Sequence, residues 1–209
     1  MTARDTATLD FYAAEAQAYA GRSREAEHAR IAAFAAAQPP GARVLELGCG
    51  GGHDSVALLD RGLDLVATDG SPELAEQASR RLGRPVGVLL FEDIDATEAF
   101  DSVWANACLL HVPRAALPGI LARIHRALKP GGLFYASFKA GTAEGRDRFG
   151  RYFNYPSPDW LRSAYGPEGW QSLVMGEDTG GGYDGEPTPW LHVTAIKGTA
   201  VTSTAVKRP

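Results

Sequence analysis

Between residues 43 and 139 the sequence alternates short apolar runs with helical patterns, and this alternation constrains the fold more than any other feature. Five apolar runs have the length of buried strands: 43–48, 63–69, 85–91, 100–106 and 133–139. Three segments between them have helical patterns: 53–62, 71–82 and 117–129. Strands that alternate with helices form parallel sheets joined by right-handed crossovers. The chain is therefore predicted to fold as an α/β protein with a doubly wound sheet and helices on both faces.

The two ends of the chain carry different patterns. Residues 10–37 are rich in alanine, the best helix former, and Gly21 is expected to divide them into two helices. We therefore predict a helical cap over residues 1–40, followed by the α/β domain at 41–197. The tail at 198–209 has no helical period and is predicted to be flexible.

After Ala140 the alternation stops. Residues 141–158 are polar and rich in glycine, but they include four aromatic residues. A loop of this length in a compact domain is usually a functional lid or a linker, and linkers are poor in aromatic residues. We therefore interpret 141–158 as a lid. A short helix is predicted next, and the apolar runs at 170–177 and 189–197 predict an antiparallel hairpin that closes the sheet.

The composition excludes several classes of protein. Lysine and arginine total 21 and aspartate and glutamate total 25, and the resulting net charge of −4 argues against DNA and RNA as partners. Cys49 and Cys108 fit neither a disulfide framework nor a zinc motif, and the histidines lack metal-ligand spacing, so no metal is expected. No apolar run approaches the ~18 residues of a membrane span, and the first ten residues lack the apolar core of a secretion signal. We expect one cytoplasmic domain without a membrane partner, as a monomer or a homodimer.

One glycine cluster, at 48–52, lies where the first predicted strand meets the first predicted helix. Ligands of open α/β sheets bind outside the carboxyl ends of the strands, and glycine lets a ligand approach the main chain. A nucleoside triphosphate loop needs a lysine that is absent here, and a dinucleotide loop needs a glycine where His53 stands. The spacing E-x-G-x-G-x-G is complete, with residues Glu46, Gly48, Gly50 and Gly52.

This spacing resembles the first motif of the class I S-adenosylmethionine-dependent methyltransferases. Asp69 ends the second predicted strand, about 20 residues beyond the loop, and resembles the family carboxylate that binds the ribose hydroxyls. Glu92 and Asp93 follow the third run, where the family has an acidic residue near the adenine, and either of them fits. Asn106 and Ala107 end the fourth run in a segment that resembles a later motif. The resemblance covers roughly residues 40–140.

The resemblance implies a Rossmann-like sheet of seven strands, mostly parallel, whose last pair is the antiparallel hairpin. It also implies S-adenosylmethionine as the cofactor. Tyr12 and Tyr19 resemble aromatic residues that close over the cofactor, where a ring face suits a sulfonium ion, although packing of the helix explains them equally well. The cofactor-binding residues implied by the resemblance are Tyr12, Tyr19, Glu46, Gly48, Cys49, Gly50, Gly52, Asp69, Gly70, Glu92, Asp93, Asn106 and Ala107.

Methyl transfer from an activated donor depends on orientation and on the exclusion of water more than on a strong catalytic group. His111, just beyond the fourth run, is a candidate for a general base that takes a proton from an oxygen or nitrogen acceptor. Tyr152 and His192 are further candidates for the acceptor site. For His111 and His192, packing in the core is the alternative role. Three arginines and four aromatic residues within 146–155 would suit an acceptor with an anionic group or a flat ring.

These residues favour a methyltransferase that acts on a small molecule, and they leave the acceptor open among carboxylate, hydroxyl, amine and thiol groups. A weaker likeness is to the tellurite-resistance methyltransferases. RNA modification is an alternative, because the run Arg-Tyr-Phe-Asn at 151–154 has a loose likeness to wobble-uridine tRNA methyltransferases. A regulatory protein that binds S-adenosylmethionine without catalysis is another, against which the complete glycine motif and Asp69 argue.

Overall fold

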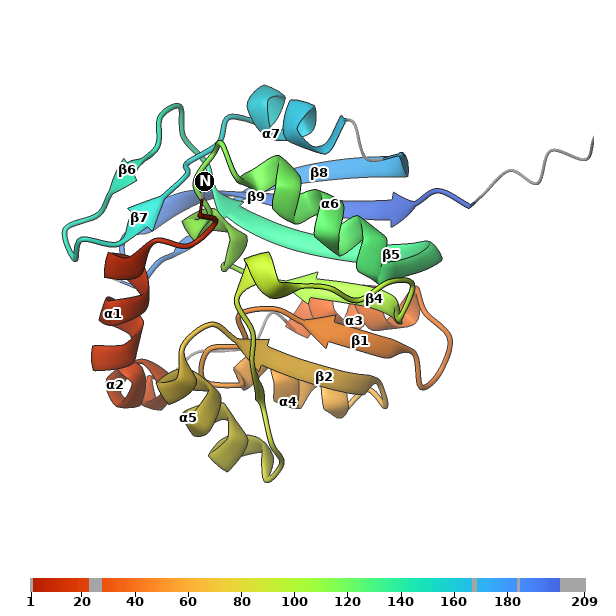
Figure 1. Cartoon of the computed structure of the whole chain (residues 1–209), viewed down its shortest axis with the longest axis horizontal. Coiled ribbons are helices and arrows are strands. Elements are labelled where there is room, and N and C mark those ends of the chain that lie inside the picture. The colour runs from red at the N-terminus through yellow and green to blue at the C-terminus, as the bar shows by residue number, and fades with distance from the viewer. Residues whose placement is uncertain (1, 23–27, 167–168, 184, 200–209) are drawn as a thin grey trace, which may run out of the picture.

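The computed structural model describes residues 2–22, 28–166, 169–183 and 185–199. They form a central sheet of seven strands in the order β3-β2-β1-β4-β5-β9-β8 (Figure 1). The strands are β1 (Arg43–Glu46), β2 (Asp64–Asp69), β3 (Gly87–Val88), β4 (Phe100–Ala105), β5 (Leu128–Lys139), β8 (Trp170–Gly181) and β9 (Pro187–Lys197). The predicted doubly wound topology is confirmed, and the strand order reverses between β1 and β4, which is where such folds bind ligands.

The strands from β1 to β5 run parallel, and β9 is antiparallel to both β5 and β8. Val44 and Leu45 are successive residues of β1 and are both buried, because a parallel sheet is covered on both faces. This explains why the central strands are continuous apolar runs in the sequence. The predicted closing hairpin is also confirmed, and its register sets Ser137 on β5 opposite His192 on β9.

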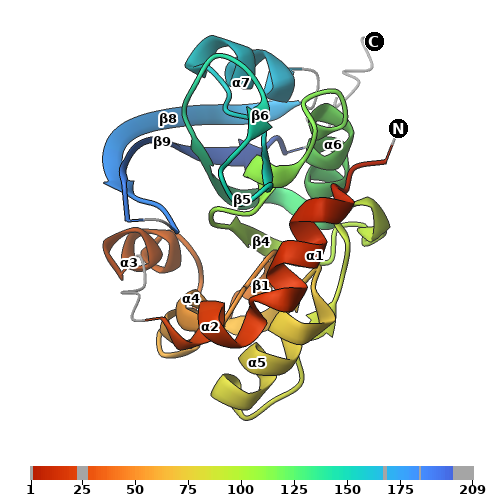
Figure 2. The ribbon, with the colours of Figure 1, turned by 90° about the vertical axis from the view of Figure 1, so that its left-hand side faces the viewer.

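Helices cover both faces of the sheet, as predicted. They are α1 (Thr6–Ala14), α2 (Ala16–Gly21), α3 (His28–Ala36), α4 (His53–Leu59), α5 (Pro72–Leu82), α6 (Leu117–Ala127) and α7 (Pro158–Tyr165). On one face α6 and α7 pack around Phe134 and Phe138, and on the other α3 and α4 pack around Trp104. Figure 2 shows α1 and α2 lying across one end of the sheet, in front of β1 and β4. The N-terminal helices therefore cover the edge at which the glycine loop emerges.

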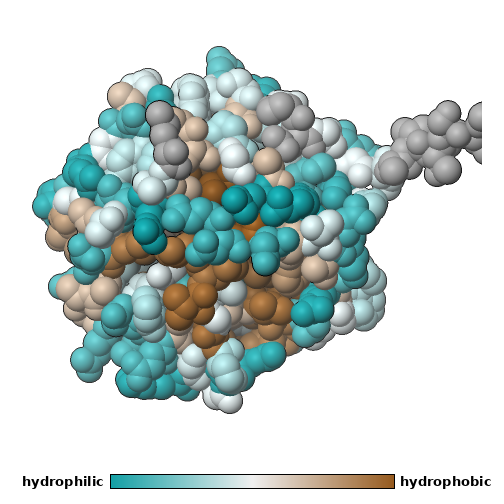
Figure 3. Space-filling model, viewed as in Figure 1, coloured by the Kyte–Doolittle hydropathy of each residue, from teal (hydrophilic) through white to brown (hydrophobic). Residues whose placement is uncertain are grey.

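The third predicted strand is much shorter than the run at 85–91, because only Gly87 and Val88 pair with β2. The chain then turns into a short 3-10 helix at Phe91–Asp93, so Leu89 and Leu90 become cavity walls instead of strand residues. β3 is an edge strand, and Val88 remains 57% exposed. Figure 3 shows apolar surface near the middle of the face seen in Figure 1.

The segment 141–158 was predicted to be a loop, but it contains a small hairpin of β6 (Gly145–Arg146) and β7 (Tyr152–Phe153). The carboxylate of Asp147 organises the turn, since it accepts hydrogen bonds from the main-chain N–H groups of Phe149 and Arg151. A side chain that replaces main-chain acceptors in this way is a local feature that hydropathy does not reveal.

Within the described ranges no helix is both long and apolar enough to cross a membrane.

Candidate functional site

The glycine loop joins β1 to α4 and contacts two other segments closely. Gly48, Gly50 and Gly52 have positive φ angles of 63°, 55° and 79°, which favour glycine. A Cβ atom on Gly48 would lie 2.4 Å from the Cβ of Cys108, and one on Gly50 would lie 3.1 Å from the ring of Tyr19. The loop therefore lies tightly between the segment after β4 and helix α2, and side chains at these positions would fill the space above it.

Gly51 also belongs to this close packing, although the motif leaves its position free. A Cβ on Gly51 would lie 2.8 Å from the Cα of Ala20 on α2. The guanidinium of Arg81 ties the same two segments together, because it donates to the carbonyls of Gly51 and Ala20. In the sequence, the three consecutive glycines at 50–52 were the signal that could have predicted this close contact.

Asp69 ends β2 beside the loop, and both of its carboxylate oxygens accept main-chain hydrogen bonds. The N–H of Gly50 donates to Oδ2 and the N–H of Ser71 donates to Oδ1, each at 2.8 Å. Burial raises the pKa of Asp69, and these two hydrogen bonds oppose that rise. Because a carboxylate oxygen has two lone pairs, each can still accept a further hydrogen bond from a ligand.

A first cavity of about 100 Å³ lies over the carboxyl ends of β1, β2 and β4, beneath α1. Many of the predicted residues line it: Tyr12, Tyr19, Gly48, Gly50, Asp69, Gly70, Glu92, Ala107 and His111. An apolar wall of Leu89, Leu90 and Phe91 was not predicted, because these residues were assigned to a strand. Of the two acidic candidates after that run, Glu92 lines the cavity, and its carboxylate accepts the N–H of Ala3 at 2.8 Å.

Four other predicted cofactor residues, Glu46, Cys49, Gly52 and Asp93, do not line this cavity. Glu46 is buried under the loop, where its carboxylate accepts the hydroxyl hydrogen of Ser55 on α4. Cys49 is also buried, and Gly52 is the N-cap of α4. Asp93 lies in the 3-10 helix beside Glu92 without lining the cavity.

A second cavity of about 520 Å³ adjoins the first. Tyr12, Tyr19, Ala107 and His111 line both cavities, so they form the junction between them. The second cavity also includes predicted residues Asn106 and His192. Arg151 and Phe153, from the segment 146–155 that was predicted to suit an acceptor, line it as well. Side chains that were not predicted complete it, among them Ser137, Lys139, Tyr183 and Trp190.

A buried polar chain holds the main chain at this junction. The amide of Asn106 donates to Asp54 at 2.7 Å and its oxygen accepts the hydroxyl hydrogen of Ser137 at 2.6 Å. The same hydroxyl oxygen accepts the N–H of Ala107 at 2.8 Å. Ala107 has a φ of 54°, a left-handed conformation that costs a non-glycine residue of order 1–3 kcal/mol and persists only where its surroundings hold it.

His111 is fixed by a hydrogen bond on each ring nitrogen. Nδ1 lies 2.6 Å from the carbonyl oxygen of Tyr152, and Nε2 lies 2.9 Å from the hydroxyl of Tyr12. A carbonyl only accepts, so Nδ1 carries the proton and the hydroxyl of Tyr12 donates to Nε2. Burial lowers the pKa of His111 to about 4, so the imidazole is neutral near pH 7. The Tyr12 hydroxyl in turn accepts a hydrogen bond from Arg151 at 3.1 Å.

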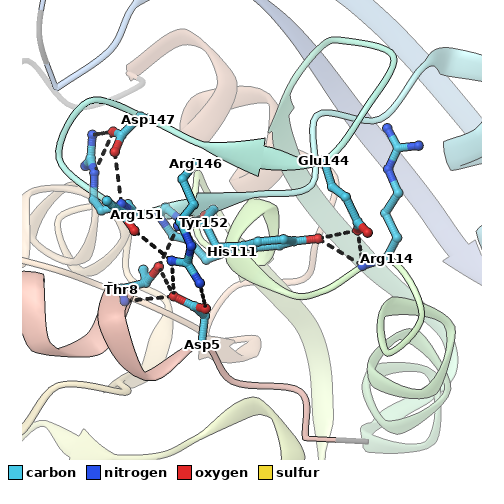
Figure 4. A network of polar contacts seen from close by, with 10 residues as sticks. Asp5, Thr8, His111, Arg114, Glu144, Arg146, Asp147, Arg151 and Tyr152 are labelled. Carbon is cyan, nitrogen blue, oxygen red and sulfur yellow. Dashed lines mark hydrogen bonds and ion pairs between the residues drawn. The ribbon is translucent and has the colours of Figure 1, made fainter.

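The phenol of Tyr152 does not line either cavity. Its hydroxyl donates to Glu144 and accepts the N–H of Arg114, away from the ring of His111 (Figure 4). Tyr152 contacts the predicted base through its main-chain carbonyl. His192, in contrast, lines the second cavity, with Nδ1 2.8 Å from the hydroxyl of Tyr135 and Nε2 3.0 Å from Asp178.

The 141–158 segment is fastened to α1 by polar contacts (Figure 4). Arg146 forms two hydrogen bonds with Asp5 at 2.6 and 3.0 Å, and the N–H of Tyr152 donates to Thr8 at 2.8 Å. Arg151 pairs with Asp147 at 2.6 Å. The guanidinium carbon of Arg151 lies within 6 Å of five aromatic ring centroids: those of Phe11, Tyr12, Phe149, Phe153 and Tyr183.

Among the described residues, no group of three or more histidine, cysteine, aspartate or glutamate side chains is placed to hold a metal ion.

Comparisons with known proteins agree with the fold and the loop. Residues 44–132 match a family model described as a methyltransferase domain. An uncharacterised methyltransferase of Synechocystis is 38% identical over 97 residues, which are 46% of this chain and 46% of that protein. A ubiquinone biosynthesis O-methyltransferase of Xanthomonas axonopodis is 38% identical over 107 residues, covering 48% of this chain and 44% of that protein. The chain thus matches about half the length of these relatives.

A solved structure shares most of the fold. It is a Burkholderia thailandensis 1,6-didemethyltoxoflavin-N1-methyltransferase with bound 1,6-didemethyltoxoflavin and S-adenosylhomocysteine. The likeness has a TM-score of 0.72 at 24% identity and covers 92% of this chain and 88% of that one. The seven-stranded sheet shares the fold of that structure, and residues 44–132 match the model of a methyltransferase domain.

Proposed function

We propose that this chain transfers a methyl group from S-adenosylmethionine to a small-molecule acceptor. The observation that carries the proposal is the pair of adjoining cavities, which share Tyr12, Tyr19, Ala107 and His111. A methyl donor in the first cavity and an acceptor in the second would meet at these four residues. In-line transfer requires this kind of arrangement, with both reactants held in contact and water excluded.

The residues around the first cavity fit the methyl donor. Asp69 can accept ribose hydroxyls with its remaining lone pairs, and the glycines leave the main chain open to close approach. Leu89, Leu90 and Phe91 offer an apolar wall to a flat base. When bound, S-adenosylmethionine supplies a methyl group that is activated on a sulfonium.

At the junction, the chain's own residues orient the reactants and handle a proton. The rings of Tyr12 and Tyr19 meet edge to face with centroids 5.2 Å apart, and an aromatic face attracts a cation such as a sulfonium. We propose that Nε2 of neutral His111 receives a proton where the acceptor carries one, in exchange for the hydrogen bond from Tyr12. The hydrogen bond from Nδ1 to the Tyr152 carbonyl keeps the ring in the tautomer that this role needs.

The position of residues 151–154 supports a small molecule over RNA as the acceptor. Arg151, Phe153 and Asn154 are buried, with at most 2% of each residue exposed. Arg151 pairs with Asp147, and the amide of Asn154 donates to the carbonyls of Leu109 and Val112, so these polar groups of the run are already engaged within the chain.

A binding and turnover assay tests the proposal. Calorimetry should detect S-adenosylhomocysteine binding, and a coupled assay should detect its release when small carboxylates, phenols, amines or thiols are supplied with S-adenosylmethionine. Bulk tRNA is the competing acceptor. Failure of S-adenosylhomocysteine to bind would overturn the proposal, and turnover on tRNA alone would replace the small-molecule acceptor with RNA.

A further inference from the structure

We propose that Asn154 is a positioning residue, which holds the ring of His111 in the orientation and tautomer that proton transfer needs. The inference rests on the proposed function, in which Nε2 of His111 receives a proton. Nε2 can accept a proton only while Nδ1 carries the ring hydrogen, and the partner of Nδ1 selects that tautomer. The partner here is the carbonyl oxygen of Tyr152, 2.6 Å from Nδ1. The residue that holds the main chain of Tyr152 against His111 therefore controls the base.

Asn154 joins the two segments that carry these groups. His111 ends a 3-10 helix at 109–111, and Tyr152 begins β7, which Asn154 follows directly. Three hydrogen bonds run from Asn154 to main-chain carbonyls on either side of His111. They are the bonds from its side-chain amide to Leu109 and Val112, at 3.0 and 3.1 Å, and from its main-chain N–H to Leu110, at 2.8 Å. One residue thus ties the turn of the base to the strand of its partner.

The surroundings of Asn154 give these bonds weight. The residue is 0% exposed, and a hydrogen bond is stronger where water is excluded. Among the described residues, its Oδ1 atom has no hydrogen-bond partner, so the side chain leaves an acceptor unpaired while both of its N–H groups are used. Asn154 lines neither cavity, so any effect on the reaction passes through His111.

Arg114 supports the same junction from the opposite direction. Its Nε donates to the carbonyl of Asn154 at 2.8 Å, and its Nη2 donates to the carbonyl of Tyr155 at 2.6 Å. Tyr155 has a φ of 33°, a left-handed conformation that is strained for a residue with a side chain and persists only where its surroundings hold it. Strain of this kind gathers at functional sites, where the main chain must keep one geometry.

The ring of His111 is also fixed by a side chain of β7. Its centroid lies 4.5 Å from that of Phe153, at an interplanar angle of 57°. Phe153 in turn stacks on Tyr155, with centroids 5.2 Å apart and an angle of 22°. The strand thus supplies both the carbonyl that binds Nδ1 and a wall for the ring, and Asn154 holds both in place.

A long-range proton–nitrogen NMR correlation spectrum of the histidine rings tests the proposal, because it shows which ring nitrogen carries the hydrogen and needs no acceptor. In the unmodified chain near pH 7, His111 should carry it on Nδ1. His111→Gln identifies the signal by its loss. The variants are Asn154→Ala and Arg114→Gln, and the second keeps both bonds from the Asn154 amide.

Ser79→Ala is the matched control. Ser79 also joins two segments by side-chain hydrogen bonds, since its hydroxyl donates to the carbonyl of Ala75 at 2.7 Å and accepts the N–H of Val86 at 2.9 Å. It lines neither cavity. A general loss of stability would therefore be shared by this variant, whereas a change at His111 would not.

We expect the ratio of the Nδ1–H to the Nε2–H tautomer of His111 to fall about 2- to 10-fold in Asn154→Ala, the range for the loss of one ordinary hydrogen bond. Arg114→Gln should lower the ratio by less, and Ser79→Ala should leave it unchanged. A ring hydrogen on Nε2 in the unmodified chain would overturn the proposal, and so would an unchanged ratio in folded Asn154→Ala or an equal fall in Ser79→Ala. If Asn154→Ala does not fold, Arg114→Gln decides, and an unchanged ratio there overturns the proposal.

The proposal and the proposed function can fail separately, because calorimetry with S-adenosylhomocysteine tests only the second. Asn154→Ala should keep the cofactor affinity of the unmodified chain. If S-adenosylhomocysteine binds but the tautomer does not depend on Asn154, the positioning role is wrong and the cofactor site stands. If the tautomer depends on Asn154 but S-adenosylhomocysteine does not bind, Asn154 positions His111 and the methyltransferase activity is wrong.

Discussion

Replacing Gly48 by alanine should destabilise the chain by two separable effects. Its φ of 63° is a conformation that costs an L-residue roughly 1–2 kcal/mol. The added Cβ would lie 2.4 Å from the Cβ of Cys108, which cannot rotate away because it is joined directly to the main chain. Overpacking of this kind typically costs about 1–3 kcal/mol. The two effects together predict a loss of about 2–5 kcal/mol.

Gly62 provides the matched control. It has a φ of 75°, and nothing lies within 4 Å of the Cβ that alanine would add. Gly62→Ala should therefore show the conformational cost alone, about 1–2 kcal/mol. For a chain of this size, about 2–4 °C of melting temperature is lost per kcal/mol, so we expect a fall of about 4–20 °C for Gly48→Ala and about 2–8 °C for Gly62→Ala.

Urea unfolding and thermal melting measure the difference in stability between the two variants. Calorimetry measures how each substitution changes the affinity for S-adenosylhomocysteine. Gly48→Ala should lose cofactor affinity, whereas Gly62→Ala should keep it. The reasoning would be refuted if Gly48→Ala were no less stable than Gly62→Ala, since the close contact with Cys108 would then carry no cost.

Three further outcomes follow from the site. Asp69→Asn can accept only one of the two main-chain hydrogen bonds with its single oxygen, so S-adenosylhomocysteine should bind with a free energy weaker by about 1–3 kcal/mol, roughly 5- to 150-fold, by calorimetry. The lowered pKa of His111, about 4, means that the folded state holds this proton less tightly than the unfolded state. Its contribution to stability is therefore complete above the unfolded pKa of about 6.5 and is lost as the pH falls toward 4, by at most about 3 kcal/mol. Between pH 7 and pH 4.5, the free energy of unfolding measured with urea should fall less in His111→Gln than in the unmodified chain. An equal fall in both would contradict this prediction. Arg146→Gln removes an exposed ion pair with Asp5, so the melting temperature should barely change while amide exchange of α1 accelerates.

The sequence predicted the parts of the site that depend on local spacing. Asp69 and the glycines were identified because strand ends and loop glycines have recognisable spacing, and the central strands were found because burial on both faces makes them continuous apolar runs. Lys139 was missed because a lysine at a strand end is ordinarily solvated, and only tertiary packing against Phe153 and Trp190 buries it.

Tyr152 and Glu46 illustrate a second limit. Both belong to segments that reach the site, but the direction of each side chain depends on a distant partner. The phenol of Tyr152 turns toward Glu144, and the carboxylate of Glu46 turns toward Ser55. Sequence position indicates which segments approach a ligand, but not which atoms of a segment face it.

Arg151 links the two cavities. It belongs to the wall of the second cavity, yet it donates to Tyr12 and packs on Phe11, which lie on the helix that roofs the first. A ligand that orders the residues around one cavity is therefore expected to order the residues around the other as well. The two substrates should bind with positive heterotropic cooperativity, and because the coupling is reciprocal, each should raise the affinity for the other by the same factor.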